Sequence, residues 1–188
     1  MITAYIDFKS LDCFLAISSI LELADDCETP VSWQPYRRKE RALPTQVANE
    51  SVTQTHHRVR AAAERRLQLH YARLRGLDID PSRGQIHTSA ALGWLASLEG
   101  DTSSFVSRLF TAHWIDRTDI NDPTFLQELT TQCGLRRTGD AVDLRLIERK
   151  AEEKGLFDAP TFFIEGQMFT GRAHIPLMRQ LLADGDDR

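Results

Sequence analysis

The sequence contains few cysteines, and their spacing does not suit a redox pair or a metal site. Only Cys13, Cys27 and Cys133 occur among 188 residues, and no Cys-x-x-Cys is present. An odd number of widely spaced cysteines argues against a disulfide framework and against a zinc site. We therefore expect no bound metal and a reducing compartment, which favours a cytoplasmic location.

Long apolar runs and an excess of positive charge are also missing. No run approaches the roughly 20 apolar residues of a membrane span, and the start of the chain lacks the basic and apolar regions of a signal peptide. The formal net charge is −4, so no global basic field attracts nucleic acid. We expect a small-molecule partner and neither a membrane nor a nucleic-acid partner. The 41% hydrophobic and 27% charged residues are ordinary for a globular domain.

The first 36 residues show a strand, a helix and a second strand. Residues 2–8 mix β-branched and aromatic residues in a short run that predicts a buried strand. Ser10 suits a helix N-cap, and apolar residues then recur with helical spacing until about Asp25. Residues 31–36 predict a second strand. A βαβ unit of this length implies a parallel pair with a right-handed crossover.

After a loop that follows the second strand, the chain is mainly helical to about residue 154, and its tail then changes character. Residues 37–56 lack any period and predict a loop, and residues 160–164 and 167–170 predict an antiparallel hairpin around Glu165-Gly166. Apolar periodicity and stop signals predict helices at about 57–75, 84–98, 102–115, 123–133, 138–154 and 173–183. A βαβ unit and a ββα unit that share one sheet form the thioredoxin arrangement. The fold class is therefore α/β, thioredoxin-like, with an all-helical insertion.

Three segments resemble a known group of proteins. Residues 7–16 are similar to the strand-to-helix motif of 2-hydroxychromene-2-carboxylate isomerases and kappa-class glutathione transferases, which reads Ser-Pro-Tyr-Ser where DsbA has Cys-Pro-His-Cys. Trp33-Gln-Pro35 resembles the Trp-x-Pro that ends their second strand, and residues 157–169 resemble the segment around their cis-proline. The resemblance implies a DsbA-type fold, with residues 1–50 and 155–188 as the thioredoxin-like domain and 51–154 as the helical insertion.

The resemblance places the reactive centre at Ser10 and Pro160. It implies that the Ser10 hydroxyl hydrogen-bonds the thiolate of glutathione, which is a cosubstrate, and that the Ala159–Pro160 bond is cis, so that Ala159 clamps an extended peptide. The N-terminus of a helix favours an anion at this point, although a serine there is also an ordinary cap. Cys13 matches the second cysteine of DsbA. Because Ser10 replaces the first, Cys13 is expected to be a buried packing residue or a lone redox thiol.

Residue chemistry and the resemblance together suggest residues that hold the ligands. Lys9 could add to the positive field, and Asn49 falls roughly where the family has an asparagine that contacts the thiol. Gly171-Arg172 begins a match to the family's Gly-x-Asp-Arg turn, but Ala173 stands where the acid that holds the glutathione ammonium is expected. Arg58 and Arg65 are candidates for a substrate carboxylate, because guanidinium groups suit carboxylates. A solvated helix face is the alternative for these two arginines.

Three functions follow as hypotheses. The first is a glutathione-dependent isomerase or transferase that acts on a small aromatic organic acid. The second is a thiol–disulfide oxidoreductase that works through Cys13, and the third is a thioredoxin-like binding protein without catalysis. Fold alone does not separate them. The resemblance also leads us to expect a homodimer.

Overall fold

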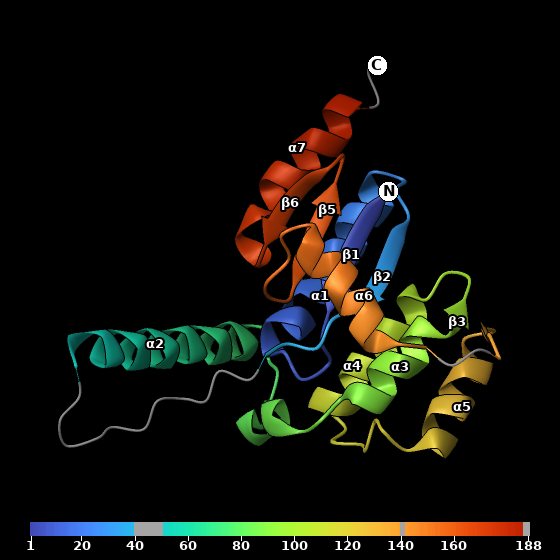
Figure 1. Ribbon diagram of the computed structural model, residues 1–188, viewed down its shortest axis with the longest axis horizontal. Helices are drawn as coiled ribbons and strands as arrows, with labels where there is room; N and C mark the ends of the chain where they lie inside the picture. The colour runs from blue at the N-terminus through green and yellow to red at the C-terminus, as the bar shows by residue number, and fades with distance from the viewer. Residues whose placement is uncertain (40–50, 140–141, 186–188) are drawn as a thin grey trace. The chain divides into compact units, whose positions relative to one another are not determined.

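The computed structural model describes residues 1–39, 51–139 and 142–185. Its centre is a four-stranded sheet in the order β2-β1-β5-β6 (Figure 1). These strands are β1 (Ile2–Ile6), β2 (Val31–Pro35), β5 (Thr161–Ile164) and β6 (Gln167–Thr170). β1 is parallel to β2 and antiparallel to β5, and β5 is antiparallel to β6. The predicted thioredoxin-like arrangement is confirmed.

The βαβ and ββα units both form where the sequence predicts them. α1 (Leu11–Asp26) connects β1 to β2, and α7 (Ile175–Gly185) follows β6 through the short 3-10 helix η2 (Arg172–His174). The β5–β6 hairpin turns at Glu165 and Gly166, which have φ of 50° and 79°. Positive φ at both central residues is the signature of a tight two-residue hairpin turn.

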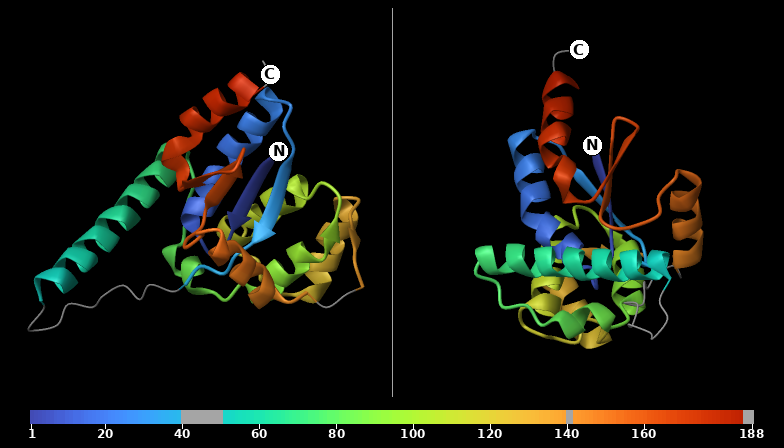
Figure 2. Two further views of the ribbon diagram at one scale, coloured as in Figure 1. Left: turned by 45° about the horizontal axis from the view of Figure 1, so that its top comes forward. Right: turned by 90° about the vertical axis from the view of Figure 1, so that its left-hand side faces the viewer.

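Helices cover both faces of the sheet. α1 and α7 pack against each other on one face, and α6 (Leu144–Glu153) lies on the other face and contacts β2 (Figure 2). Ile2, Ala4 and Ile6 lie on one face of β1 and are fully buried, and Tyr5 on the opposite face is only 6% exposed. Burial on both faces explains why this strand is apolar almost throughout.

The helices between β2 and β5 differ in detail from the prediction. α2 (Val52–Leu74) begins earlier than predicted, because Ser51 and Gln54 form a capping box. The single helix predicted at 84–98 is instead η1 (Pro81–Gln85) followed by α3 (Ser89–Ala96). α4 (Ser103–Trp114) and α5 (Pro123–Gln132) agree closely with their predictions, and Asp122 caps α5 as expected. α6 is shorter than the predicted helix at 138–154. β3 (Leu98–Glu99) and β4 (Arg136–Arg137) form a small ladder, the Thr138 N–H continues it by donating to the Ser97 carbonyl, and Asp143 caps the start of α6.

The chain forms two compact units. One comprises residues 1–38 and 80–188, and we call it the body; the other comprises residues 39–79 and includes α2. Helices α3 to α6 share the body with the sheet, since α4 packs on α1 and α3 packs on β2. The predicted boundary of a helical insertion at 51–154 remains a prediction. Within the described ranges, no helix is long and apolar enough to cross a membrane.

Candidate functional site

Ser10 lies at the point where β1 ends and α1 begins. Residues 7–10 form a turn in which the Ser10 N–H donates to the Asp7 carbonyl at 3.0 Å. The Ser10 Oγ accepts a hydrogen bond from the Cys13 N–H at 3.3 Å, so Ser10 is the N-cap of α1. The free N–H groups and the dipole of this 16-residue helix make its tip favourable for negative charge.

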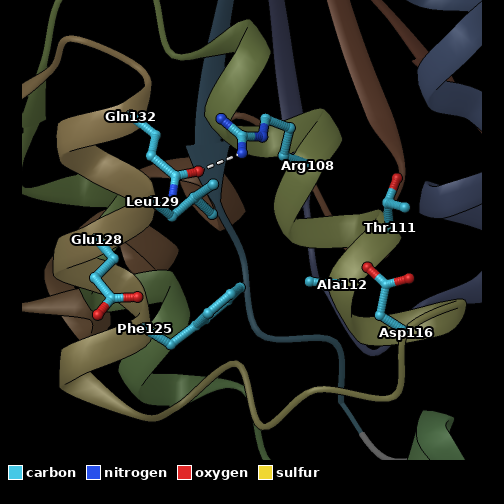
Figure 3. A pocket seen from close by; sticks show the side chains of 8 residues that line it. All are labelled: Arg108, Thr111, Ala112, Asp116, Phe125, Glu128, Leu129 and Gln132. Atoms are coloured by element: carbon cyan, nitrogen blue, oxygen red, sulfur yellow. Dashed lines mark hydrogen bonds between the residues drawn. The ribbon is translucent and has the colours of Figure 1, made fainter.

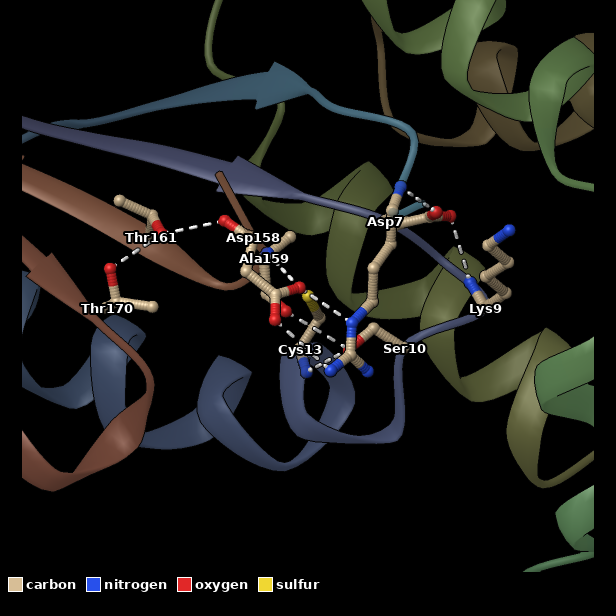
Figure 4. Close-up of polar contacts among 9 residues, drawn as sticks. Asp7, Lys9, Ser10, Cys13, Asp158, Ala159, Thr161 and Thr170 are labelled. Carbon is tan, nitrogen blue, oxygen red and sulfur yellow. Dashed lines mark hydrogen bonds and ion pairs between the residues drawn. The ribbon is translucent and has the colours of Figure 1, made fainter. Parts of the chain in front are cut away.

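The segment before β5 closes over this helix tip. The Ala159–Pro160 peptide bond is cis, and the Ser10 hydroxyl donates to the Ala159 carbonyl at 3.5 Å (Figure 4). Ser10 is only 2% exposed and Ala159 only 3%. The Gly171 N–H donates to the Pro160 carbonyl at 2.8 Å, which joins the predicted glycine turn to the same segment. Ser10, Ala159, Pro160 and Gly171 are therefore brought together.

An ion pair beside the cis bond was not predicted from the sequence. The Arg38 Nε donates to Asp158 Oδ1 at 2.7 Å, and both side chains are partly buried. The same carboxylate oxygen accepts from the Ala159 N–H at 2.9 Å. Thus the Ala159 N–H and C=O, which the resemblance assigns to a ligand clamp, both have partners within the chain.

Asp7 is a second residue that the sequence analysis did not assign to the site. Its buried carboxylate accepts from the backbone N–H groups of Lys9 at 3.2 Å and Arg38 at 2.7 Å, and from the hydroxyl of Thr88. Burial raises the pKa of Asp7, while these hydrogen bonds and the charge of Lys9 act in the opposite direction. The Trp114 Nε1–H also donates to the Phe8 carbonyl at 3.0 Å. Residues of α4 and of the N-cap of α3 thereby hold the turn at residues 7–10. In the sequence, the only sign of this role is that an acid follows an apolar strand.

Cys13 lies one turn into α1 and is completely buried. Its thiol is not in a disulfide. Burial raises the pKa of Cys13 to about 12, although the hydrogen bonds from the Asp7 backbone and from Ser10 act against this rise. Because the thiolate is the nucleophilic form, this cysteine is a weak nucleophile at neutral pH.

A second ion pair joins the first turn of α1 to η2, the short helix that follows β6. The Arg172 Nε is 3.5 Å from Asp12 Oδ1, and both side chains are largely covered. Asp12 belongs to the first turn of α1, where a carboxylate is stabilised by the helix dipole. Ala173 is exposed on η2. The helix tip therefore carries one acid and one base from two distant segments, although position 173 itself has no acid.

The remaining predicted site residues are Lys9, Asn49, Arg58 and Arg65. Asn49 lies outside the described residues. Arg58 and Arg65 lie seven residues apart on one side of α2, in the compact unit 39–79. Lys9 is half-buried and its backbone binds Asp7. The ligand roles of these residues remain predictions.

A hollow of about 220 Å³ lies between α4 and α5 (Figure 3). Phe125, Ala112 and Leu129 supply its apolar wall, while Arg108, Asp116 and Glu128 supply charged groups at its edge. None of the residues that the sequence analysis assigned to the site lines this hollow. It is therefore separate from the Ser10–Pro160 centre.

A parallel βαβ unit, an antiparallel ββα unit and a cis-proline beside the N-terminus of a helix define a thioredoxin-like domain, and Ser10 is the N-cap of that helix. The family model of the DSBA-like thioredoxin domain matches residues 1–183. The chain belongs to this DSBA-like thioredoxin family. Comparison with curated proteins gives no match.

Solved structures of the same fold cover the whole chain at low identity. A 2-hydroxychromene-2-carboxylate isomerase has a TM-score of 0.68 and 16% identity, over 98% of this chain and 95% of its own. A probable DsbA oxidoreductase from Streptomyces coelicolor has a TM-score of 0.61 and 14% identity, over 100% and 90%. The cytosolic disulfide reductase DsbM from Pseudomonas aeruginosa, solved with glutathione, has a TM-score of 0.55 and 17% identity, over 100% and 99%. At these identities the likeness concerns the fold.

Proposed function

We propose that this protein is a glutathione-dependent isomerase or transferase that acts on a small aromatic organic acid. The observation that carries the proposal is the contrast between Ser10 and Cys13 at the tip of α1. Ser10 offers a hydroxyl at a helix N-terminus beside Ala159 and Pro160, whereas the only thiol in this turn is buried with a raised pKa. Such a centre is better suited to stabilising the thiolate of a cosubstrate than to cycling a dithiol of its own.

In this proposal the Ser10 hydroxyl exchanges one acceptor for another. It now donates to the Ala159 carbonyl over a long 3.5 Å, and the glutathione thiolate takes the place of that carbonyl. A hydrogen bond to a charged acceptor is stronger than one to a neutral acceptor. The exchange is therefore favourable, provided that the segment at residues 158–160 moves to admit the sulfur atom.

The thiolate then acts as a reversible nucleophile. It adds to a carbon–carbon double bond conjugated with a carbonyl group, and the electron pair of that double bond moves onto the carbonyl oxygen. Rotation about the resulting single bond follows. The electron pair returns, the double bond forms again in the isomerised acid, and the carbon–sulfur bond breaks to release the thiolate. No net oxidation occurs.

The binding groups come from the segments that meet at the helix tip. Ala159, Pro160 and Gly171 supply the backbone surface, and Lys9 supplies a positive charge next to Ser10; a contact of Asn49 with the thiol rests on the resemblance alone. Asp12 and Arg172 carry the charges that suit the ammonium and carboxylate of the glutamyl end of glutathione. For the carboxylate of the second substrate, Arg58 and Arg65 of α2 are the candidates because of their guanidinium chemistry alone, which implies no position relative to Ser10.

The second candidate is a thioredoxin-like binding protein without catalysis. Two observations favour it over an oxidoreductase. The Ser10 hydroxyl donates to the Ala159 carbonyl and the Ala159 N–H donates to Asp158, so these groups already have partners within the chain, and position 173 is alanine. A redox function through Cys13 is weaker still, because the thiol is buried and holds its proton.

Glutathione titration of the wild type and of Ser10→Ala tests the proposal. Calorimetry should detect binding at millimolar glutathione, and ultraviolet absorbance of the thiolate should show the pKa of the bound thiol. Losing a charged hydrogen bond of ~1.5–3 kcal/mol should raise that pKa by about one to two units in Ser10→Ala.

Ser18→Ala is the matched control, because Ser18 is an exposed serine on the same helix. It should leave the pKa of the bound thiol unchanged. Ser10→Ala also removes a helix cap worth ~1 kcal/mol, so a melting curve must show that the variant is folded. A wild type that binds no glutathione at millimolar concentration would overturn the catalytic proposal and leave the binding protein in its place.

A further inference from the structure

α2 carries an exposed apolar stripe along its whole length. Val52, Val59, Leu67 and Leu74 are separated by seven, eight and seven residues, so they lie on one side of the helix. Tyr71 lies one turn from both Leu67 and Leu74 and extends the stripe. These five side chains are between 40% and 73% exposed. A large apolar stripe on a soluble chain marks an interaction surface.

The helix is also the basic part of an acidic protein. Residues 39–79 hold eight of the 23 basic residues and four of the 27 acidic ones, which leaves 15 basic and 23 acidic residues in the body. The formal charge is therefore +4 on the unit that contains α2 and −8 on the body. α2 itself contains five arginines and a single glutamate. Its complement is a surface that is acidic and partly apolar.

The body of a second copy has both properties. Besides its net negative charge, it exposes Phe157 and Leu177, which are 59% and 46% accessible. Nucleic acid would match the charge of α2 but would leave its apolar stripe in water. Two α2 helices packed on each other would cover the stripe but would bring like charges together, which is unfavourable.

The buried surface area also favours α2 packed on the body of the other copy over α2 packed on α2. A helix of 23 residues is about 34 Å long and about 10 Å wide. Pairing α2 with α2 therefore removes roughly 700 Å² of total surface, below the roughly 1,200 Å² of a stable interface. Two reciprocal contacts, in which each α2 lies on the other copy's body, remove roughly 1,400 Å² and reach that range.

We propose that this protein forms a symmetric dimer in which α2 of each copy docks, through its apolar stripe and its arginines, on the acidic body of the other. A two-fold axis makes the two contacts identical. The proposal is independent of the proposed catalytic function. It names the surface that a dimer of this chain uses.

Light-scattering mass measurement across a dilution series tests the proposal with Leu67→Glu and His57→Glu. Both variants add one negative charge to an exposed position of α2, but His57 lies outside the stripe. The wild type and His57→Glu should be dimeric at tens of micromolar. Leu67→Glu should raise the dissociation constant of the dimer by roughly tenfold or more. Circular dichroism should show an unchanged helix content, because glutamate is a good helix former.

The salt dependence separates the possible partners of α2. Raising the ionic strength should weaken the wild-type dimer, because opposite charges then attract less. A dimer that strengthens with salt would indicate α2 packed on α2 and overturn the proposal. So would a wild type that is monomeric throughout, or a monomer whose Leu67-dependent binding to anionic phospholipid vesicles shows that a lipid surface covers the stripe.

Discussion

At the scale of single residues, two side chains at the first turn of α1 differ in their contacts and in their chemistry. Ser10 and Cys13 share the tip of α1 and are joined by a hydrogen bond between the Cys13 N–H and the Ser10 Oγ. The hydroxyl contacts the segment that bears Pro160, whereas the thiol is buried where its charged form is poorly solvated. In this turn the hydroxyl therefore contacts the Ala159–Pro160 segment, whereas the thiol is a weak nucleophile at neutral pH.

This contrast predicts the order in which the three thiols react. With a pKa of about 12, Cys13 has about 1 thiolate per 100,000 molecules at pH 7. Cys27 and Cys133 are half-buried. A thiol reagent with mass-spectrometric readout should therefore label Cys27 and Cys133 in the native protein, and should label Cys13 only after unfolding. The double variant Cys27→Ser, Cys133→Ser should show no fast labelling; rapid reaction of that variant, together with disulfide reductase activity lost in Cys13→Ser, would favour the oxidoreductase.

At the scale of elements, the ends of several segments meet at one buried carboxylate. Asp7 follows β1, Arg38 follows β2, and Thr88 precedes α3 as its N-cap. The Thr88 hydroxyl does not cap its own helix but donates to Asp7. Thr88 therefore leaves α3 without a side-chain cap, and its hydroxyl instead orients the turn before Ser10.

Thr88→Val should therefore destabilise the protein through Asp7. A hydrogen bond to a charged group contributes about 1.5–3 kcal/mol, and valine keeps the shape of threonine while removing the donor. Urea unfolding should show a loss of this size. Thr102→Val is the matched control, because Thr102 is also a buried N-cap without a side-chain cap hydrogen bond; it should change stability by less than about 0.5 kcal/mol. Equal losses in the two variants would show that Asp7 gains nothing from Thr88.

At the scale of the whole molecule, a buried histidine links the folding of the body to pH. The His113 side chain is fully buried on α4. Arg83 Nη2 lies 3.3 Å from His113 Nδ1, and His113 Nε2 lies 3.1 Å from the Arg83 carbonyl. Burial, and next the charge of Arg83, lower the pKa of His113 to about 4. The neutral ring suits these contacts, because one nitrogen accepts from Arg83 and the other donates to its carbonyl.

The lowered pKa predicts a loss of stability in mild acid. The unfolded chain binds a proton on His113 below its ordinary pKa of about 6.5, whereas the folded chain does so only near 4. The stabilisation is complete above pH 6.5 and is lost as pH falls toward 4, by about 2 kcal/mol between pH 7 and pH 5. Urea unfolding at both values should show this loss in the wild type and a smaller one in His113→Gln. The raised pKa of Asp7 acts in the opposite direction, because it favours the folded state as pH falls. The contribution of His113 is therefore the difference in loss between the wild type and His113→Gln. Identical losses in the two proteins would contradict this role.

The order of the main elements could be predicted from the sequence alone, and so could the cis bond at Ala159–Pro160. Caps such as Ser10 and Asp122, the turn at Glu165-Gly166 and the alternation of apolar residues depend on neighbours a few positions away, so they can be read locally. The same locality explains the misplaced starts of α2 and α6. A capping box or a two-residue ladder shifts a boundary without changing the apolar period.

The partners of the polar groups around Ser10 could not be predicted from the sequence, because they depend on how distant elements pack. Asp7 and Thr88 are 81 residues apart, and Arg38 and Asp158 are 120 apart. No periodicity connects such pairs, because they meet only where packed elements end at the same edge of the sheet. The burial of Ser10 is decided in the same way, by the Ala159–Pro160 segment that lies over it. A buried polar group must find a partner wherever packing brings one, and sequence distance places no limit on where that is.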